Sequence, residues 1–130
     1  MKFLIVDDDF TNRLLLQEIL KDYARIHIAV DGKEAVQAVV FALDDNAPYD
    51  AVFLDIMMPR LNGQDALKEI RSIENERGFE IGKGTKIIMI TALNDKRNIM
   101  ESFKSQADGY IIKPVIQEDL INKLKNLGLI

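Results

Sequence analysis

Residues 3–9 read FLIVDDD, a run of four apolar residues that leads directly into three carboxylates. The apolar half has the composition of a buried β-strand. Asp7, Asp8 and Asp9 follow it, and like charges about 4 Å apart repel by roughly 1 kcal/mol in water and by about 4 kcal/mol at an effective dielectric near 20. A strand that ends in such a cluster therefore needs a compensating positive charge beside it.

The overall composition limits what the protein can do. The chain has 130 residues, 48% of them hydrophobic, so we expect a single domain over residues 1–130 with no output domain. It has no cysteine, which excludes disulfides and catalytic thiols. The formal charge is −4 and the basic residues are scattered, so no nucleic-acid-binding patch is predicted. The apolar start is too short for a signal peptide or a membrane span, and a cytoplasmic protein is expected.

Apolar runs of strand length alternate along the chain with segments of helical spacing. The strand-like runs are residues 2–6, 25–30, 50–54, 86–91 and 110–113. The helical segments are residues 11–23, 62–74, 95–105 and 117–127, with one more after the Asp31-Gly32 turn. Gly128 is placed to end the last helix in a left-handed conformation. This alternation predicts an α/β fold, a doubly wound parallel sheet of five strands flanked by five helices.

Chemically active residues follow four of the predicted strands. Asp7 and Asp8 follow the first strand, Asp55 the third, while Thr91 and Lys113 end the fourth and fifth. Sheets of this type bind ligands beyond the carboxyl ends of their strands, so we expect these five side chains to meet at one edge. Carboxylate oxygens suit Mg²⁺, which would offset the repulsion among the acids. A carboxylate can also attack phosphorus to form an acyl phosphate, while an ammonium, a hydroxyl and a metal neutralise the phosphoryl charge.

Four stretches of the sequence carry a resemblance to a known family. They are FLIVDDD at 3–9, VFLDIMMPRLNG at 52–63, IMITA at 88–92 and GYIIKP at 109–114. In this order, spread over essentially the whole chain, they resemble the receiver domain of response regulators, the phosphoacceptor of two-component signalling. The resemblance implies a flavodoxin-like fold with strand order 2-1-3-4-5. It also implies a switch with only intrinsic self-phosphorylation and self-dephosphorylation activity, not an enzyme.

The resemblance implies a role for each residue at the predicted edge. Asp55 would be the phosphoacceptor. Asp8, Asp55 and the backbone carbonyl of Met57 would bind Mg²⁺, with Asp7 reaching the metal largely through water. Lys113 would contact the phosphoryl group.

Two further residues match the positions that move in this family. Thr91 would shift to hydrogen-bond the phosphoryl group, and the ring of Tyr110 would turn inward as it does so. A packing role for Tyr110 remains the alternative, because the sequence alone does not show aromatic switching. Lys113 and Pro114 match a Lys-Pro pair of the family whose peptide bond is often cis.

The sequence also departs from the family in ways that bear on function. The segments 41–50 and 74–85 are longer than usual, and the second reads as an extended surface loop. Met57 and Leu93 stand two residues after the phosphoacceptor and two after the threonine, where the family tunes hydrolysis of the acyl phosphate. Because neither apolar side chain can orient a water by hydrogen bonding, we expect a comparatively long-lived phosphoryl group.

Other residues have simpler interpretations. Asp9 is expected to cap the first helix, and His27, the single histidine, to be structural or exposed. The methionines of IMMP at 56–59 are expected to fill core gaps instead of binding a soft metal. GKGT at 82–85 is not a phosphate-binding loop, because it lacks the required spacing and precedes a strand instead of following one.

Three functions remain in competition at this point. The favoured one is Mg²⁺-dependent transfer of a phosphoryl group to Asp55 from a sensor histidine kinase or phosphotransfer protein, which switches a surface for a downstream protein effector. The protein would then be a monomer or a phosphorylation-dependent homodimer. A haloacid-dehalogenase-like phosphohydrolase is less favoured, because it needs a second aspartate where Met57 stands. A phosphorylation-independent binding module usually lacks a site residue, and none is lacking here.

Overall fold

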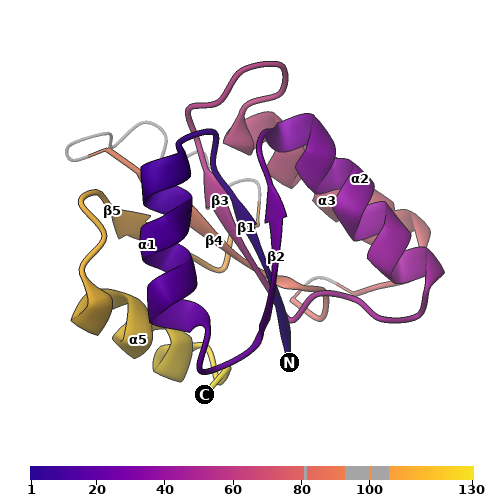
Figure 1. Cartoon of the computed structure of the whole chain (residues 1–130). Helices are drawn as coiled ribbons and strands as arrows, with labels where there is room; N and C mark the ends of the chain where they lie inside the picture. Colours follow the sequence, from indigo (N-terminus) through magenta and orange to yellow (C-terminus); the bar gives the residue numbers. More distant parts are fainter. Residues whose placement is uncertain (81, 93–99, 101–105) are drawn as a thin grey trace.

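The computed structural model describes residues 1–80, 82–92, 100 and 106–130. Five strands and four helices lie within these residues (Figure 1). In chain order they are β1 (Lys2–Val6), α1 (Phe10–Leu20), β2 (Arg25–Ala29), α2 (Gly32–Asp44), β3 (Ala51–Asp55), α3 (Gly63–Glu76), β4 (Lys86–Thr91), β5 (Gly109–Ile112) and α5 (Gln117–Asn126). Of the helix expected at 95–105, the structure describes Met100 alone, which is helical. None of the helices in the described part is long and apolar enough to cross a membrane.

The five strands form one parallel sheet in the order β2-β1-β3-β4-β5, which confirms the predicted fold. The register aligns Val6 at the end of β1 with Leu54 in β3. It also aligns Asp55 with Ile90 in β4. The residues that follow β1 and those that end β3 therefore lie side by side at the carboxyl edge of the sheet.

Helices cover both faces of this sheet (Figure 1). Apolar side chains of alternating strand positions pack under α2 and α3 on one face and against α1 and α5 on the other. The buried strand residues under α2 and α3 include Leu4, Val6, Val52, Leu54, Ile87 and Met89. Those that pack against α1 and α5 include Phe3, Ile5, Phe53, Ile88 and Ile90. Both faces of the central strands are thus buried, as their nearly continuous apolar sequences predict.

Short polar side chains begin three of the helices. The Asp9 carboxylate accepts a hydrogen bond from Thr11 N at 2.9 Å, so this residue caps α1 as predicted. Asp31 and Asn62 cap α2 and α3 in the same way. At the other end of the chain, Gly128 follows α5 with a φ of 74°, the left-handed conformation predicted for it.

Two helix boundaries differ from the sequence prediction. Helix α1 ends at Leu20 instead of residue 23, and both Leu15 and Tyr23 are exposed. The buried residues of the helix are Leu16, Ile19 and Leu20. Helix α3 continues to Glu76, so the expected surface loop at 74–85 begins later than predicted.

The start of that segment is buried because Arg71 draws acidic and carbonyl groups together. Its Nη1 donates to Glu74 Oε1 at 2.7 Å, and its Nη2 donates to Asp108 Oδ2 at 2.8 Å. Further bonds run from Arg71 to the carbonyls of Thr85 and Gln106. This network joins α3 to the segments that lead into β4 and β5, at the amino end of those strands.

Candidate functional site

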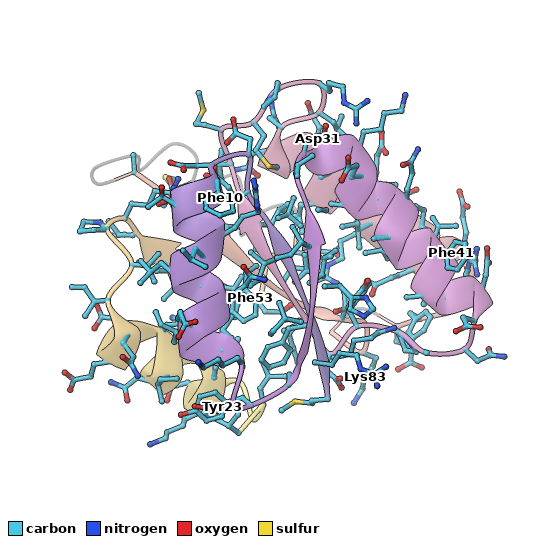
Figure 2. All side chains as sticks on the ribbon, viewed as in Figure 1. Phe10, Tyr23, Asp31, Phe41, Phe53 and Lys83 are labelled. Atoms are coloured by element: carbon cyan, nitrogen blue, oxygen red, sulfur yellow. The ribbon has the colours of Figure 1, made fainter. Side chains whose placement is uncertain are left out.

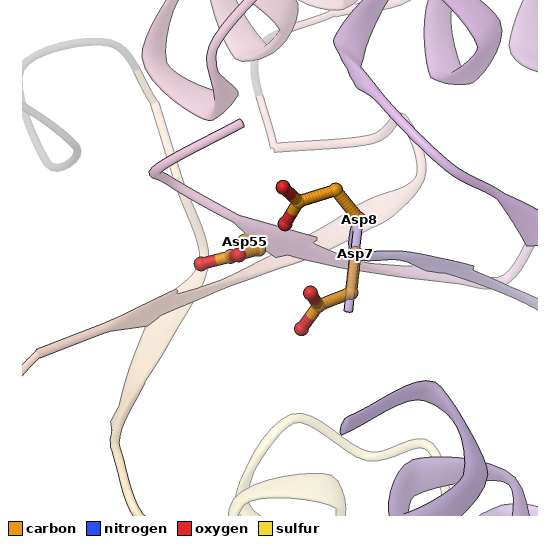
Figure 3. Close-up of side chains that lie close together, drawn as sticks. All are labelled: Asp7, Asp8 and Asp55. Atoms are coloured by element: carbon orange, nitrogen blue, oxygen red, sulfur yellow. The ribbon is translucent and has the colours of Figure 1, made fainter. Parts of the chain in front are cut away.

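Three carboxylates meet at the carboxyl edge of the sheet, where the sequence placed them. Asp7 and Asp8 follow β1, and Asp55 is the last residue of β3 (Figure 3). One carboxylate oxygen from each residue lies within 4.8 Å of the other two. Asp7 and Asp55 are buried, whereas Asp8 is exposed. Two acids therefore form the floor of the cluster and the third faces solvent.

Burial makes the ionised form of these acids costly. Loss of hydration, followed by the charge of Asp7, raises the pKa of Asp55 to about 6, against the attraction of Lys113. Burial also raises the pKa of Asp7. The site thus concentrates negative charge in a place that solvates it poorly, which favours a bound cation.

The hydrogen bonds of Asp7 leave one of its oxygens free to bind such a cation. Asp7 Oδ1 accepts from Asp9 N at 2.9 Å. Asp7 Oδ2 is buried and has no hydrogen-bond partner among the described residues. A buried, unpaired carboxylate oxygen beside two further carboxylates is a donor set that suits a hard divalent ion such as Mg²⁺.

Lys113 supplies a positive charge beside the acidic residues that follow β1 and end β3. Its Nζ lies 3.2 Å from Asp55 Oδ1, and its backbone N donates to Thr91 O at 2.7 Å, extending the ladder between β4 and β5. The Lys113–Pro114 peptide bond is cis, in agreement with the resemblance. The predicted acid and base therefore form an ion pair in this structure.

Thr91 lies on β4, which is next to β3, and Tyr110 lies on β5, on the other side of β4. Thr91 ends β4 and is buried, and its Oγ1 has no partner among the described residues. Tyr110 in β5 is half-buried, with Lys123 Nζ 5.6 Å from the centre of its ring. A buried hydroxyl without a partner, one strand away from Asp55, is available for a new hydrogen bond.

Met57 lies in the loop that follows Asp55, at the carboxyl edge of the sheet. The Met57 side chain is 72% exposed, so this methionine does not fill the core as the sequence interpretation had it. Its backbone N–H forms a hydrogen bond to Asp55 that lowers the pKa of that carboxyl. Met57 therefore takes part in the site through its backbone. Leu93, the second expected tuning position, lies outside the described residues.

Residues with simpler interpretations lie where these predict. His27 Nδ1 is 2.7 Å from the Tyr49 hydroxyl, so the histidine has a structural partner. Lys83 of the GKGT stretch precedes β4 and lies at the end of the molecule opposite to Asp31 and Phe10 (Figure 2). The rejected phosphate loop is therefore remote from the acid cluster.

Three supporting residues escaped the sequence interpretation. Arg13 Nη1 donates to the carbonyl of Asp7 at 2.9 Å. Arg60 Nε donates to Asp31 Oδ2 at 2.7 Å, which ties the loop after β3 to the start of α2. The sequence signal for Asp31 was read only as a turn, and no local pattern links it to an arginine 29 residues further along the chain.

A family model for the response regulator receiver domain matches residues 3–125 of the chain. The chain belongs to this family. It is 34% identical over 127 residues to the transcriptional regulatory protein SrrA of Staphylococcus aureus, a match that covers 97% of the chain and 47% of SrrA. This receiver domain thus spans about half the length of the curated relatives it matches.

Solved structures show the same fold. The chemotaxis protein CheY4 of Vibrio cholerae is 27% identical with a TM-score of 0.77, and the match covers 97% of each chain. The receiver domain of Ssk1 from Saccharomyces cerevisiae, crystallised with the histidine phosphotransfer protein Ypd1, is 26% identical with a TM-score of 0.84; the match covers 98% of this chain and 88% of the other. The protein is therefore a receiver domain of two-component signalling.

Proposed function

We propose that Asp55 accepts a phosphoryl group from a phosphohistidine and that the resulting acyl phosphate switches the surface of this receiver domain. The observation that carries the proposal is the combination of a buried Asp55, the Lys113 ammonium 3.2 Å from it, and two further carboxylates. A nucleophile, a fixed positive charge and a cation site are the parts that phosphoryl transfer requires.

The chemical step is a displacement at phosphorus. A carboxylate oxygen of Asp55 forms a bond to the phosphorus atom, and the bond between phosphorus and the donor's imidazole nitrogen breaks, leaving the electron pair on that nitrogen. The Lys113 ammonium, which already pairs with Asp55, is placed to neutralise charge on the transferred group. Catalysis of this kind depends mainly on positioning and charge.

Asp7, Asp8, Asp55 and the Met57 carbonyl would hold the divalent ion. When bound, Mg²⁺ would reduce the repulsion between the incoming phosphoryl oxygens and the acid cluster. The unpaired Asp7 Oδ2 and the mutual proximity of the three carboxylates support this assignment. The ion is also expected to favour the ionised, nucleophilic form of Asp55, whose pKa burial raises to about 6.

Thr91 and Tyr110 would convert phosphorylation into a change of shape. The Oγ1 of Thr91, which has no partner among the described residues, would donate to a phosphoryl oxygen and so give the phosphorylated state an additional hydrogen bond. The ring of Tyr110 would follow this movement. Phosphorylation can change the populations of the two conformations only by as much as its interaction energy differs between them.

Exposed apolar side chains on the segments that follow β1, β3 and β5 support a protein as the phosphodonor. Phe10 and Leu14 on α1, Met57 after β3 and Ile116 before α5 are large apolar side chains that remain exposed. Figure 2 shows Phe10 at the upper end of α1. The similarity to the Ssk1 receiver domain, which was crystallised with a histidine phosphotransfer protein, makes a phosphotransfer protein or sensor kinase the proposed partner.

Two other functions are less well supported. A phosphohydrolase of the haloacid-dehalogenase type would place a second aspartate two residues after Asp55, where Met57 exposes an apolar side chain instead. A binding module that works without phosphorylation would have no use for an ion pair between Lys113 and Asp55 beside an unpaired buried carboxylate oxygen.

Identification of the modified residue tests the proposal. The protein is incubated with Mg²⁺ and a small acyl phosphate, reduced with borohydride, and digested. We expect reduction of the acyl phosphate to convert Asp55, and no other aspartate, to homoserine in the peptide masses. Conversion of Asp7, Asp8 or Asp9 in place of Asp55 would contradict the assignment.

The lifetime of the phosphoryl group is a second part of the proposal. Met57 and Leu93 cannot orient an attacking water, so the acyl phosphate should decay slowly. Leu93→Glu is expected to speed its decay, followed by intact mass after removal of the donor. An unchanged rate in this variant would contradict the proposed role of the apolar pair.

A further inference from the structure

The loop from Ile56 to Asn62 is tied to its surroundings at both ends and in its middle. Ile56 N donates to Ile90 O at 3.1 Å, and Asn62 caps α3. Between these ends, two bonds join the loop to the start of α2. Gly32 N donates to Leu61 O at 3.0 Å, and Arg60 Nε donates to Asp31 Oδ2 at 2.7 Å.

The start of α2 fits this loop closely. A Cβ added to Gly32 would lie 2.1 Å from Leu61 O, so only glycine allows the two backbones to approach this far. Asp31 uses both carboxylate oxygens, since Oδ1 accepts from Glu34 N at 2.9 Å and Oδ2 accepts from Arg60. Its side chain is only 7% exposed. The hydrogen bond from Arg60 also lowers the pKa of Asp31.

Arg60 occupies an unfavourable backbone conformation to make this contact. Its φ is 65°, in the left-handed region that residues other than glycine and asparagine rarely adopt. Glycine would take the same conformation without strain. The ion pair with Asp31 is what an arginine provides here and a glycine does not, and strain of this kind concentrates at functional sites.

We infer that Arg60 and Asp31 are positioning residues, whose ion pair holds the loop after Asp55 so that the Met57 backbone is fixed beside the acid cluster. This inference rests on the proposed function, in which the Met57 carbonyl binds the cation. Neither residue touches the reacting atoms. Asp31 caps α2 and holds Arg60, and the effect passes along the backbone from Arg60 to Met57, which lies three residues earlier in the chain.

The test compares variants that remove the ion pair in different ways. Arg60→Gln removes the charge and keeps the left-handed conformation, whereas Arg60→Gly removes the charge and relieves the strain. Asp31→Asn keeps a side-chain oxygen to cap α2 but presents an amide donor to Arg60. The matched control is Arg77→Gln, which breaks the ion pair between Arg77 and Asp44 at the far ends of α3 and α2.

Two readouts separate positioning from general stability. The first is the Mg²⁺ dissociation constant, measured from backbone amide chemical shifts in solution. The second is amide hydrogen exchange of residues 56–62 in the metal-free protein. We expect each variant of the pair to weaken Mg²⁺ binding by about 10-fold, the low end of the effect of replacing a residue that hydrogen-bonds a metal ligand, because this pair acts only through the backbone of the loop. We also expect each variant to speed hydrogen exchange in the loop. Arg77→Gln should change neither.

The outcomes are distinguishable from a failure of the proposed function. If the unmodified protein binds no Mg²⁺, the proposed function fails, whatever the variants do. If it binds Mg²⁺ and both Arg60→Gln and Arg60→Gly bind equally well, the inference is overturned while the function stands. Because Arg60→Gly relieves the backbone strain and Arg60→Gln does not, a loss of Mg²⁺ affinity that both variants share reflects the missing ion pair and not the backbone conformation. A double variant that combines Asp31→Asn with Arg60→Gln should lose no more Mg²⁺ affinity than either single variant.

Discussion

The Lys113 ammonium lies 3.2 Å from the Asp55 carboxylate, although Lys113 follows β5 and Asp55 ends β3, with β4 between these strands. The Asp55 side chain is 4% exposed and the Lys113 side chain 31%, so the pair lies at the boundary between core and solvent. Lys113 is therefore a fixed positive charge that favours the ionised form of a buried nucleophile.

Removal of this charge should raise the pKa of Asp55 above its value of about 6. The variant is Lys113→Met, and the measurement is a pH titration of the aspartate carboxyl carbons by NMR in the absence of metal. Lys86→Met, at the amino end of β4, serves as the control because it lies near Asp108 and away from the acid cluster. An Asp55 titration that does not move in Lys113→Met would show that the ion pair does not stabilise the carboxylate.

Asp55→Asn should stabilise the metal-free protein at pH 7. The folded pKa of about 6 exceeds the unfolded value of about 3.9, so the folded state binds more protons between these values and stability falls as pH rises through this window. The cost is fully present above about pH 6 and absent below about pH 4. A displacement of two pKa units corresponds to at most about 3 kcal/mol, and we expect roughly 1–3 kcal/mol.

Urea unfolding at pH 7 and near pH 4 measures this effect. The advantage of Asp55→Asn should disappear at the lower pH, and added Mg²⁺ should stabilise the unmodified protein more than the variant. A variant that is less stable than the unmodified protein at pH 7 would mean that the pairing with Lys113 outweighs the burial of the charge.

The sequence was sufficient to place the site because of a general property of parallel sheets. Asp7, Asp55, Thr91 and Lys113 each follow or end an apolar run, and parallel strands present their carboxyl ends at one edge. Their side chains meet there without any information on long-range contacts. Caps such as Asp9 were predictable for the related reason that they act within a few residues of the helix they begin.

Supporting contacts between distant segments could not be predicted in this way. Arg60 and Asp31 are far apart in the chain, and the strained conformation of Arg60 has no signature in the amino-acid sequence. Glu74 was placed in a surface loop because its neighbours are polar, yet Arg71 pairs with it and buries it. Tertiary contacts, which local patterns do not encode, decide these cases.

Thr91→Val should leave stability nearly unchanged and impair the response to phosphorylation. The Oγ1 of Thr91 is buried and unpartnered in the described part of the chain, so an apolar group of the same shape removes no existing bond. Thr85→Val is a matched control, because its hydroxyl is also buried and unpartnered but lies at the amino end of β4.

Amide NMR spectra with and without a phosphoryl donor separate the two variants. We expect the unmodified protein and Thr85→Val to show the same shifts in β5 on phosphorylation, and Thr91→Val to lose most of them. Equal responses in all three proteins would remove Thr91 from the proposed switch.

Arg71→Met should destabilise the protein by about 3–5 kcal/mol, since it leaves the carboxylates of Glu74 and Asp108 without their buried partner. Arg77→Met breaks a more exposed ion pair with Asp44 and should cost less than about 1 kcal/mol. Urea unfolding of both variants measures the difference. A loss in Arg71→Met no larger than that in Arg77→Met would show that the network contributes little to stability.

Intact mass shows directly whether Asp55 is a Mg²⁺-dependent phosphoacceptor. The protein is incubated with a small acyl phosphate, with and without Mg²⁺, beside Asp55→Asn. We expect a single phosphoryl adduct that requires Mg²⁺ and is absent from Asp55→Asn. An equal adduct in Asp55→Asn, or one that forms equally well without metal, would contradict this role of Asp55.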